Sequence, residues 1–502
     1  MADRRCPVNR LGQAALAHLT ESALLSLPAR HTAASTVGVV HLGIGAFHRA
    51  HQAVYTEDAV LATGDTGWGI CGVTQRSASV RNQLAPQGGL YGVLQKDADV
   101  PAALRITGIV REVLDGPTQA GDVLDRLADP AVAVVTLTVS EKGYRRGPDG
   151  RLDLADATVR ADVGGAAPAG AVGRLVRGLQ RRRERDAGPV TVLCCDNLNH
   201  NGAVVAGLVA DFCRALPTRE GEPLADWIGA HVAFPSSMVD RIVPATTAED
   251  RAQALAISGL DDEGLVTAEP FGQWVIEDRF AARRPAWELA GAQLTDDVTP
   301  FELMKLRILN GSHSTLAYLG ALAGHRTIAD AVADDGLRDV ATALIRDDMI
   351  PTLAQPDGVD LVEYGDRVLA RYANPGLRHT TVQIAMDGTQ KLPQRLVAPA
   401  VAAIEAGRRP HAVTLGLAAW MAYVALGRDR DGRPLPLDDP MADVLGAVRG
   451  TTDAATVADR LLAVEPVFGP LLPDVGWWRQ ELVDDVRSLL AGRIPAFSSV
   501  RT

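Results

Sequence analysis

Hydrophobic positions divide the chain into a first part with strand-like runs and a second part with helix-like periodicity. The strand-like runs are short, rich in β-branched residues and separated by helical segments; the clearest are residues 37–42, 68–73, 132–139 and 189–195. This alternation predicts a doubly wound parallel sheet flanked by helices. From Thr299 onwards the strand-like runs disappear and Ala- and Leu-rich helical patterns dominate. The pattern predicts an α/β domain over residues 1–295 and a mainly α-helical domain over residues 296–502, with a site in the cleft between them.

The first predicted strand runs directly into a glycine turn, and residues 52–61 beyond it have helical character. Strand, glycine turn and helix is the order that binds the pyrophosphate of a dinucleotide. Gly43 would permit the tight turn, Gly45 would let the backbone approach the phosphates, and Arg49 could add positive charge. His48 replaces the third glycine of this fingerprint, so the motif alone is weak evidence. Together with the parallel strands that follow, it predicts a Rossmann-like domain whose strand ends converge on a ligand.

The stretch 299–314 combines a strong helix start with polar groups that chemistry could use. Thr299 fits an N-cap, Pro300 the first helical position and Glu302 the third position of a capping box. In an α-helix, which turns about 100° per residue, Lys305 and His313 would lie roughly 80° apart.

Asn310 falls in the same sector as Lys305 and His313, so one face would carry an amine, an amide and an imidazole. Apolar neighbours should disfavour the charged form of Lys305 and lower its pKa, so that it could act as a base. The alternatives are a solvated lysine and an Asn-Gly pair that ends the helix.

Three other polar segments have both a structural and a functional interpretation. The amide-rich stretch 196–202 could stabilise a developing alkoxide or could be an ordinary Asn- and Gly-rich turn. Asp240 and Arg241, inside an apolar segment, are either an ion pair or part of a site. The segment 374–395 is either a solvated face or a binding segment; its polar residues are Arg378, His379, Gln383, Asp387, Lys391 and Arg395.

Composition narrows the function. With 50 basic and 61 acidic residues the net charge is -11, which does not favour nucleic acid or an anionic membrane as a partner. The five cysteines lack CxxC spacing, so neither a disulfide framework nor a zinc ribbon is indicated. No window approaches the ~18 apolar residues of a membrane span, and the start does not resemble a signal peptide. We therefore expect a cytoplasmic protein.

These motifs together resemble the mannitol dehydrogenase family of long-chain, metal-independent polyol and sugar-acid dehydrogenases. The resemblance runs from about residue 37 to beyond residue 395. It rests on residues 43–51, 68–71, 138–144, 195–197 and 238–244 and on the sequence Lys305-Leu-Arg-Ile-Leu-Asn-Gly-Ser-His313. It implies hydride transfer between a secondary alcohol and a nicotinamide cofactor, with a lysine as general base.

Site residues follow from the resemblance position by position. Lys305 matches the family's general base, Asn201 and Asn310 its alkoxide-stabilising pair, His313 a substrate-binding residue and Glu141 the acid that relays the proton to water. The expected substrate-binding residues are Arg378, His379, Gln383 and Lys391. The expected cofactor-binding residues are Val39, Val40, His41, Leu42, Gly43, Ile44, Gly45, Ala46, Phe47, His48, Arg49, Ala50, Thr138 and Asp240.

The substrate is less sharply implied than the reaction. Residues 269–278 and 378–395 resemble the sugar-acid branch, which interconverts D-mannonate and D-fructuronate, and Gln383 stands where the mannitol branch has a substrate-contacting arginine. The loop 197–202 is closer to the polyol branch, so a polyol 2-dehydrogenase acting on mannitol or arabinitol is the alternative. A dinucleotide sensor without catalysis is a third reading.

The cofactor and assembly implied by the resemblance are as follows. NAD is expected, with NADP left open because residues 74–76 carry no carboxylate. The partner would be a small-molecule sugar acid or polyol, and the assembly a monomer or small homo-oligomer.

Overall fold

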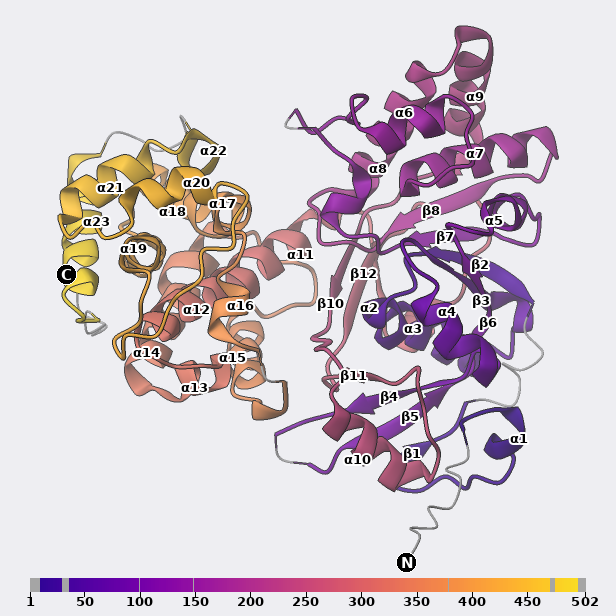
Figure 1. Ribbon diagram of the computed structural model, residues 1–502, viewed down its shortest axis with the longest axis horizontal. Helices are drawn as coiled ribbons and strands as arrows, with labels where there is room; N and C mark the ends of the chain where they lie inside the picture. The colour runs from indigo at the N-terminus through magenta and orange to yellow at the C-terminus, as the bar shows by residue number, and fades with distance from the viewer. Residues whose placement is uncertain are drawn as a thin grey trace, which may run out of the picture. The chain divides into compact units, whose positions relative to one another are not determined.

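A computed structural model describes residues 10–28, 36–98, 100–147, 149–377, 379–469 and 475–494. The chain forms two compact units, Met1–Thr299 and Pro300–Thr502. Figure 1 labels their helices and strands.

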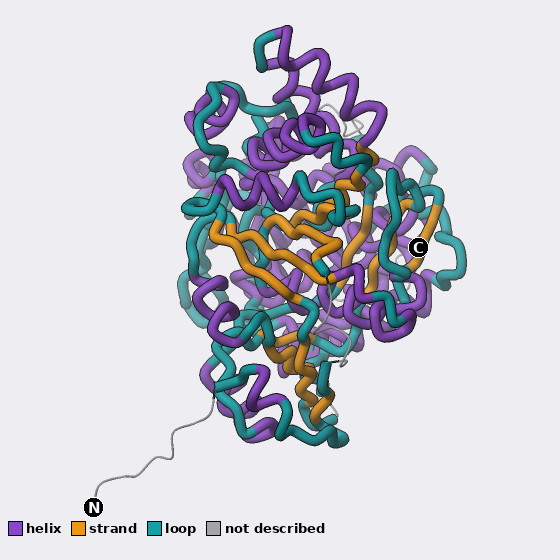
Figure 2. The backbone as a smooth tube through the Cα atoms, turned by 90° about the vertical axis from the view of Figure 1, so that its right-hand side faces the viewer, coloured by secondary structure: helices purple, strands orange, loops and turns teal. Residues whose placement is uncertain are grey.

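The centre of unit 1 is a six-stranded parallel sheet in the order β6-β3-β2-β7-β8-β9. Numbered in chain order within this sheet, the strands run 3-2-1-4-5-6, which is the Rossmann order with its switch point between β2 and β7. The strands lie side by side in Figure 2. Their bounds are β2 Val37–Leu42, β3 Gly69–Thr74, β6 Val110–Asp115, β7 Val134–Leu137, β8 Val190–Cys194 and β9 Val232–Ala233. The predicted doubly wound parallel sheet is confirmed.

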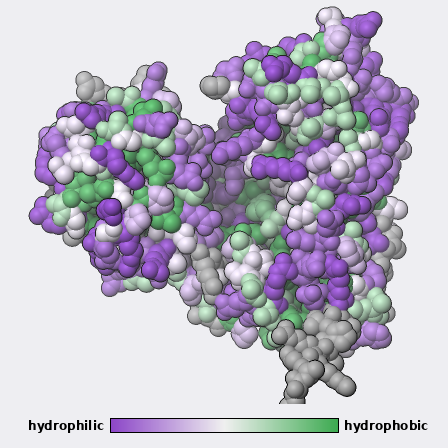
Figure 3. All heavy atoms as spheres, in the orientation of Figure 1, coloured by the Kyte–Doolittle hydropathy of each residue, from purple (hydrophilic) through white to green (hydrophobic). Residues whose placement is uncertain are grey.

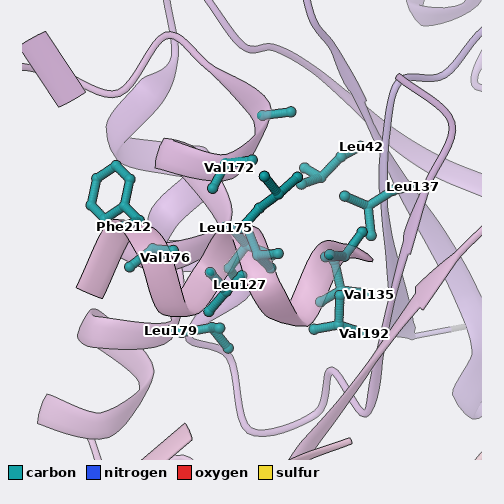
Figure 4. Close-up of a cluster of buried hydrophobic side chains, with 14 of the residues drawn as sticks. Leu42, Leu127, Val135, Leu137, Val172, Leu175, Val176, Leu179, Val192 and Phe212 are labelled. Atoms are coloured by element: carbon teal, nitrogen blue, oxygen red, sulfur yellow. The ribbon is translucent and has the colours of Figure 1, made fainter. Parts of the chain in front are cut away.

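Both faces of this sheet are apolar because helices cover each of them. Val40 and Val135 point into a core that includes helices α5, α7 and α8, whereas the adjacent Val39 and Val134 belong to the core on the α2 and α3 side. Figure 4 shows part of the first core, in which residues of α7 such as Leu175 pack beside strand residues. The helices of unit 1 are α1 Gln13–Leu16, α2 Ala46–Ala50, α3 Gln52–Thr63, α4 Ser79–Leu84, α5 Ala120–Leu127, α6 Ala157–Val163, α7 Ala171–Glu184, α8 Asn201–Ala215, α9 Thr218–His231 and α10 Ala248–Ser258.

Two smaller sheets complete unit 1, and neither was foreseen from the sequence. One has the order β1-β5-β4-β11 and the other the order β10-β12-β13. Their bounds are β1 Leu25–Ser26, β4 Tyr91–Gln95, β5 Ala103–Thr107, β11 Val266–Ala268, β10 Ser237–Asp240, β12 Gln273–Glu277 and β13 Gln293–Thr295.

Every regular element described in unit 2 is helical, as the sequence pattern predicted. Helix α19 is buried along nearly its whole length and packs against α12 and α23, because its sequence is apolar all round. The helices are α11 Thr299–Met304, α12 Ser312–Leu322, α13 Ile328–Ala333, α14 Asp335–Ala343, α15 Leu361–Tyr372, α16 Thr381–Ile384, α17 Gly388–Leu392, α18 Ala398–Glu405, α19 His411–Leu426, α20 Ala442–Leu445, α21 Ala454–Leu462, α22 Glu465–Phe468 and α23 Gly476–Leu490. Three π-helical segments interrupt them: η6 Lys305–Gly311, η7 Leu344–Met349 and η10 Pro393–Val397.

In the face shown in Figure 3, hydrophilic side chains cover most of the visible surface. Among the described helices, none combines the length and the hydropathy that a membrane span requires.

Candidate functional site

The turn after β2 is built around Gly43. Its φ of +104° lies in the left-handed region, and a Cβ at this position would be 2.1 Å from the carbonyl oxygen of Thr138. The backbone N–H groups of Gly43 and Ile44 donate to the carbonyl of Val73 at 2.9 and 3.2 Å. The turn is therefore fixed between β3 and β7 at the switch point of the sheet, where open α/β sheets bind their ligands.

Gly45 is the N-cap of α2, and unlike Gly43 it has a backbone conformation that does not require glycine. Its φ of -94° is open to any residue, and a Cβ there would meet only the carbonyl oxygen of Gly43 at 3.7 Å. No side chain caps this helix. No side chain therefore blocks the approach to the first backbone N–H groups of α2, and a pyrophosphate could accept hydrogen bonds from them. The turn fits a dinucleotide.

His41 is linked to this turn by hydrogen bonds through Thr138 and also binds Thr136. Its Nδ1 and Nε2 lie 2.7 and 2.8 Å from the hydroxyls of Thr136 and Thr138, and Thr138 donates its hydroxyl proton to the carbonyl of Gly43. Thr138 must then accept from the imidazole, so His41 carries its proton on Nε2. Burial lowers the pKa of His41 to about 3, which keeps the ring neutral. The ring of His48, also fully buried, stacks on His41 with the centroids 3.4 Å apart.

The guanidinium of Arg49 is buried against backbone carbonyls. Arg49 is 6% exposed, and its guanidinium donates to the carbonyls of Gly45 and Gly264 and lies over the ring of Tyr91. Burial lowers its pKa. In this arrangement the guanidinium of Arg49 binds backbone carbonyls and stabilises the turn. Its role as a direct phosphate ligand stays a prediction.

The Asp240-Arg241 pair lies at the end of β10. Asp240 is 4% exposed, and it pairs in register with Gln273 of β12. The guanidinium of Arg241 donates to the carbonyl oxygens of Glu269 and Ala50, so Arg241 ties this sheet to the end of α2.

The loop after β7 is fixed by a carboxylate that the sequence analysis did not single out. Asp196, two residues after the end of β8, accepts hydrogen bonds from the backbone N–H groups of Val139 and Ser140 and from the hydroxyl of Tyr144. Burial raises the pKa of Asp196, and these hydrogen bonds oppose that rise. Glu141, the predicted proton relay, follows immediately and is exposed. A carboxylate shortly after a buried strand was the available signal.

Asn201 begins α8 and is fully buried. Its side-chain N–H groups donate to the carbonyls of Asp196 and Ser237 at 3.1 and 2.7 Å, and its Oδ1 accepts from the N–H of Ser237. The neighbouring Gly202 has no room for a Cβ, which would lie 2.5 Å from the carbonyl of Phe234. In this arrangement Asn201 joins the end of β8 to β10. Its role as an alkoxide donor stays a prediction and requires one N–H to change partner.

In unit 2 the polar face predicted for residues 305–313 lies on two successive helical segments, η6 and α12. Helix α11 begins at Thr299, and the N–H of Thr299 donates to the carboxylate of Asp297. From Lys305 to Gly311 the helix is π, and α12 follows without a break.

A π-helix turns less per residue than an α-helix because its hydrogen bonds span five residues. The angle predicted between Lys305 and His313 assumed a regular α-helix, which this segment is not. The Asn-Gly pair at 310–311 does not end the helix. Gly311 has a helical φ of -66°, and a Cβ there would lie 2.9 Å from the carbonyl oxygen of Arg395 in η10.

The three candidate side chains of this face differ in exposure. Lys305 and His313 are each 8% exposed and Asn310 is half-buried. The Nε2 atom of His313 has no hydrogen-bond partner among the described residues. Its ring stacks on Tyr372, with the centroids 5.0 Å apart and the planes inclined by 16°.

The surroundings of His313 are positively charged. Its pKa lies well below the ordinary value, first because the ring is buried and then because His379, Arg395, Lys391 and Arg371 are close. The ring of His379 is 5.7 Å away, and burial lowers its pKa as well. Both imidazoles are therefore neutral near pH 7.

The other polar residues of the segment 374–395 are placed as follows. The Nζ of Lys391 donates to the carbonyl of Met386 at 2.6 Å, and Arg395 donates to the hydroxyl of Ser314 at 3.1 Å. Gln383, in α16, is exposed. Arg378 lies outside the described residues. Within the described part of the chain, no three His, Cys, Asp or Glu side chains are grouped as metal ligands would be.

Two family models match the sequence. Residues 37–289 match the mannitol dehydrogenase Rossmann domain, and residues 297–490 match the mannitol dehydrogenase C-terminal domain.

Related proteins match over most of their length. The uncharacterized oxidoreductase YeiQ of Escherichia coli (strain K12) is 44% identical over 87% of this chain and 88% of its own. D-mannonate oxidoreductase of the same strain is 42% identical over 87% of this chain and 89% of its own. Among solved structures, the Pseudomonas fluorescens mannitol 2-dehydrogenase ternary complex with NAD and D-mannitol is 35% identical, with a TM-score of 0.83, and covers 96% of each chain.

Proposed function

The chain belongs to the mannitol dehydrogenase family, and on that premise we propose that it interconverts D-mannonate and D-fructuronate with NAD as the hydride carrier. At the level of the family it is an oxidoreductase that acts on a secondary alcohol of a polyol or sugar acid with NAD(P). In the proposal unit 1 binds the dinucleotide, and unit 2 supplies the base and most of the substrate contacts.

The observation that supports a sugar acid most directly is the positive charge around His313. The side chains of Arg371, Lys391 and Arg395 all act electrostatically on its ring. A carboxylate can leave water at low cost only where cationic or multiply donating groups replace its hydration. Such surroundings suit the carboxylate of D-mannonate, which D-mannitol lacks. The 42% identity with D-mannonate oxidoreductase supports the same substrate.

The cofactor proposal rests on the glycine turn. Gly43 allows the close turn, Gly45 leaves space for phosphate, and the first N–H groups of α2 would donate to the pyrophosphate. When bound, nicotinamide supplies the hydride acceptor. NAD is preferred because the related mannitol 2-dehydrogenase structure contains it. Residues 74–76, at the end of β3, contain no carboxylate to bind the ribose 2′-hydroxyl of NAD, and Arg76 could bind the 2′-phosphate of NADP. A higher kcat/KM with NADP+ than with NAD+ would therefore reverse this preference.

The proposed catalytic roles are those that the residue types suit. Lys305, as a neutral amine, takes the hydroxyl proton, and Asn310 and Asn201 donate hydrogen bonds to the oxygen as it becomes negative. Neutral His313 can donate a hydrogen bond to a substrate hydroxyl or accept one from it. Glu141, exposed at the start of its loop, passes the proton to water.

A substrate panel tests the function. We expect oxidation of D-mannonate with NAD+ to exceed that of D-mannitol and D-arabinitol by at least about 100-fold in kcat/KM, since a site built for a polar group rejects substrates that lack it. Lys391→Ala should raise KM for D-mannonate while leaving KM for NAD+ unchanged, and Arg395→Ala should do the same. Equal or faster oxidation of D-mannitol would overturn the assignment.

The alternative is a polyol 2-dehydrogenase, and the likeness to mannitol 2-dehydrogenase favours it. That structure is similar over 96% of this chain. The same panel decides, because a polyol enzyme would oxidise D-mannitol or D-arabinitol faster than D-mannonate. If no substrate yields NADH although NADH binds, the protein is a dinucleotide-binding sensor.

A further inference from the structure

The π-helical segment η6 carries both Lys305 and Asn310, the proposed base and one alkoxide donor. In a π-helix the hydrogen bonds span five residues, so the carbonyls where it joins an α-helix lose their regular partners. Side-chain hydroxyls can then bind these carbonyls. The groups that do so determine where Lys305 and Asn310 lie relative to α12.

At this junction two side-chain hydroxyls bind successive carbonyls. Ser312 donates to the carbonyl of Ile308, and the hydroxyl of Tyr372 donates to the carbonyl of Leu309 at 2.5 Å. The backbone N–H of Ser312 also donates to Leu309. Tyr372 is the last residue of α15 and is only 4% exposed. One of the two hydroxyls at the junction therefore comes from a different helix, α15.

The ring of the same tyrosine contacts His313. The two rings stack with centroids 5.0 Å apart, and the Nε2 of His313 has no hydrogen-bond partner among the described residues. Contact with Tyr372 therefore contributes directly to fixing the plane of the imidazole. One side chain touches both the backbone of η6 and the imidazole that follows it.

We propose that Tyr372 is a positioning residue: its hydroxyl holds the π-helical segment that presents Lys305 and Asn310, and its ring holds His313. This inference rests on the proposed roles of Lys305 and His313 in catalysis. Tyr372 itself transfers no proton and needs no contact with the substrate.

Tyr372→Phe removes the hydroxyl and keeps the ring. A matched control is Tyr423→Phe, because Tyr423 is also buried in unit 2 and its hydroxyl donates to the carbonyl of Pro436 at 2.8 Å. We expect kcat for D-mannonate oxidation to fall about 10-fold or more in Tyr372→Phe, since small displacements of catalytic groups are costly. KM for NAD+ should not change. In Tyr423→Phe, kcat should stay within about 2-fold of the wild type while thermal stability falls by a similar amount in both variants.

A double-mutant cycle separates positioning from general destabilisation. If Tyr372 acts through Lys305, Tyr372→Phe should lower the small remaining rate of Lys305→Ala by less than about 2-fold, whereas independent effects would multiply. Tyr372→Leu, which also removes the ring, should raise KM for D-mannonate beyond that of Tyr372→Phe.

The outcomes distinguish this inference from the proposed function. If Lys305→Ala keeps near-normal kcat, the proposed base is wrong and the inference loses its foundation. If Lys305→Ala is impaired but Tyr372→Phe matches Tyr423→Phe in kcat, only the positioning role is overturned. A full 10-fold effect of Tyr372→Phe in the Lys305→Ala background would also overturn it.

Discussion

The two glycines of the turn after β2 should respond differently to alanine, because only one of them is required by the backbone. At Gly43 the φ of +104° would cost an alanine about 1–2 kcal/mol. The Cβ, 2.1 Å from the carbonyl of Thr138, would add about 1–3 kcal/mol of overpacking. Gly43→Ala should therefore lower the free energy of unfolding by about 2–5 kcal/mol.

Gly45→Ala should instead leave the fold intact and weaken dinucleotide binding. Its φ of -94° suits alanine, and the loss of glycine flexibility in the unfolded chain should stabilise the protein by about 0.4–1 kcal/mol. The methyl group would stand where phosphate approaches the first N–H groups of α2. A hydrogen bond to a charged group contributes about 1.5–3 kcal/mol, so losing one should raise the Kd for NADH by roughly 10- to 150-fold.

The assay combines urea unfolding with fluorescence titration of NADH. Gly188→Ala is the control for backbone strain, because Gly188 has a φ of +78° and nothing within 4 Å of its Cβ position. The Gly188→Ala variant should lose about 1–2 kcal/mol in the free energy of unfolding and keep the wild-type Kd for NADH. Wild-type NADH affinity in Gly45→Ala would refute the phosphate site. Equal stability of Gly43→Ala and Gly188→Ala would refute the close approach of Gly43 to Thr138.

Three other changes test the catalytic lysine, the packing of η6 and the buried imidazole. Lys305→Ala should lower kcat for oxidation at least about 100-fold, abolish its rise with pH and preserve NADH binding; a normal kcat and pH profile would exclude Lys305 as the base. Gly311→Ala would place a Cβ 2.9 Å from the carbonyl oxygen of Arg395 and should lower the free energy of unfolding in urea by about 1–3 kcal/mol. Gly446 is the control, because nothing lies within 4 Å of its Cβ position, and an equal loss in Gly446→Ala would contradict this packing. Because the folded-state pKa of His41 is about 3, below its ordinary 6.5, the unfolded chain binds the additional proton. Stability should therefore fall as the pH drops from about 6.5 towards 3, by up to about 1.4 kcal/mol per pH unit, and an unchanged slope in His41→Gln would contradict this origin.

The central sheet could be predicted because its strands are buried on both faces. A strand covered by helices on each side must be apolar along its length, so runs such as residues 37–42 are visible without any alignment. The β1-β5-β4-β11 sheet leaves no such trace. Its strand β1 has two residues, Leu25 and Ser26, which pair with Leu104 and Arg105 almost 80 positions later. A two-residue strand has no periodicity to detect, and its pairing is decided by tertiary contacts.

The directions of single charged side chains also could not be predicted from the sequence. Arg49 stands where a phosphate ligand would be expected, yet its guanidinium turns inward to two carbonyls. Asp196 looked like part of a polar turn, yet it fixes the loop that carries Glu141. Residue type and spacing indicate which groups are near a site. The direction of each side chain depends on which backbone groups would otherwise be buried without a partner.

The helix that bears Lys305 shows why the chemistry of a site can be inferred earlier than its geometry. An amine, an amide and an imidazole within nine residues already indicate proton transfer beside a developing negative charge. Their relative directions follow from η6 being π-helical. A tyrosine hydroxyl more than 60 positions away binds this segment, and Gly311 packs closely against the carbonyl of Arg395. Local rules assign α-helix to residues 305–309 and an end to the Asn-Gly pair. Tertiary hydrogen bonds override both rules, so a change at Tyr372 or Gly311 should redirect Lys305 without altering any residue of the proposed chemistry.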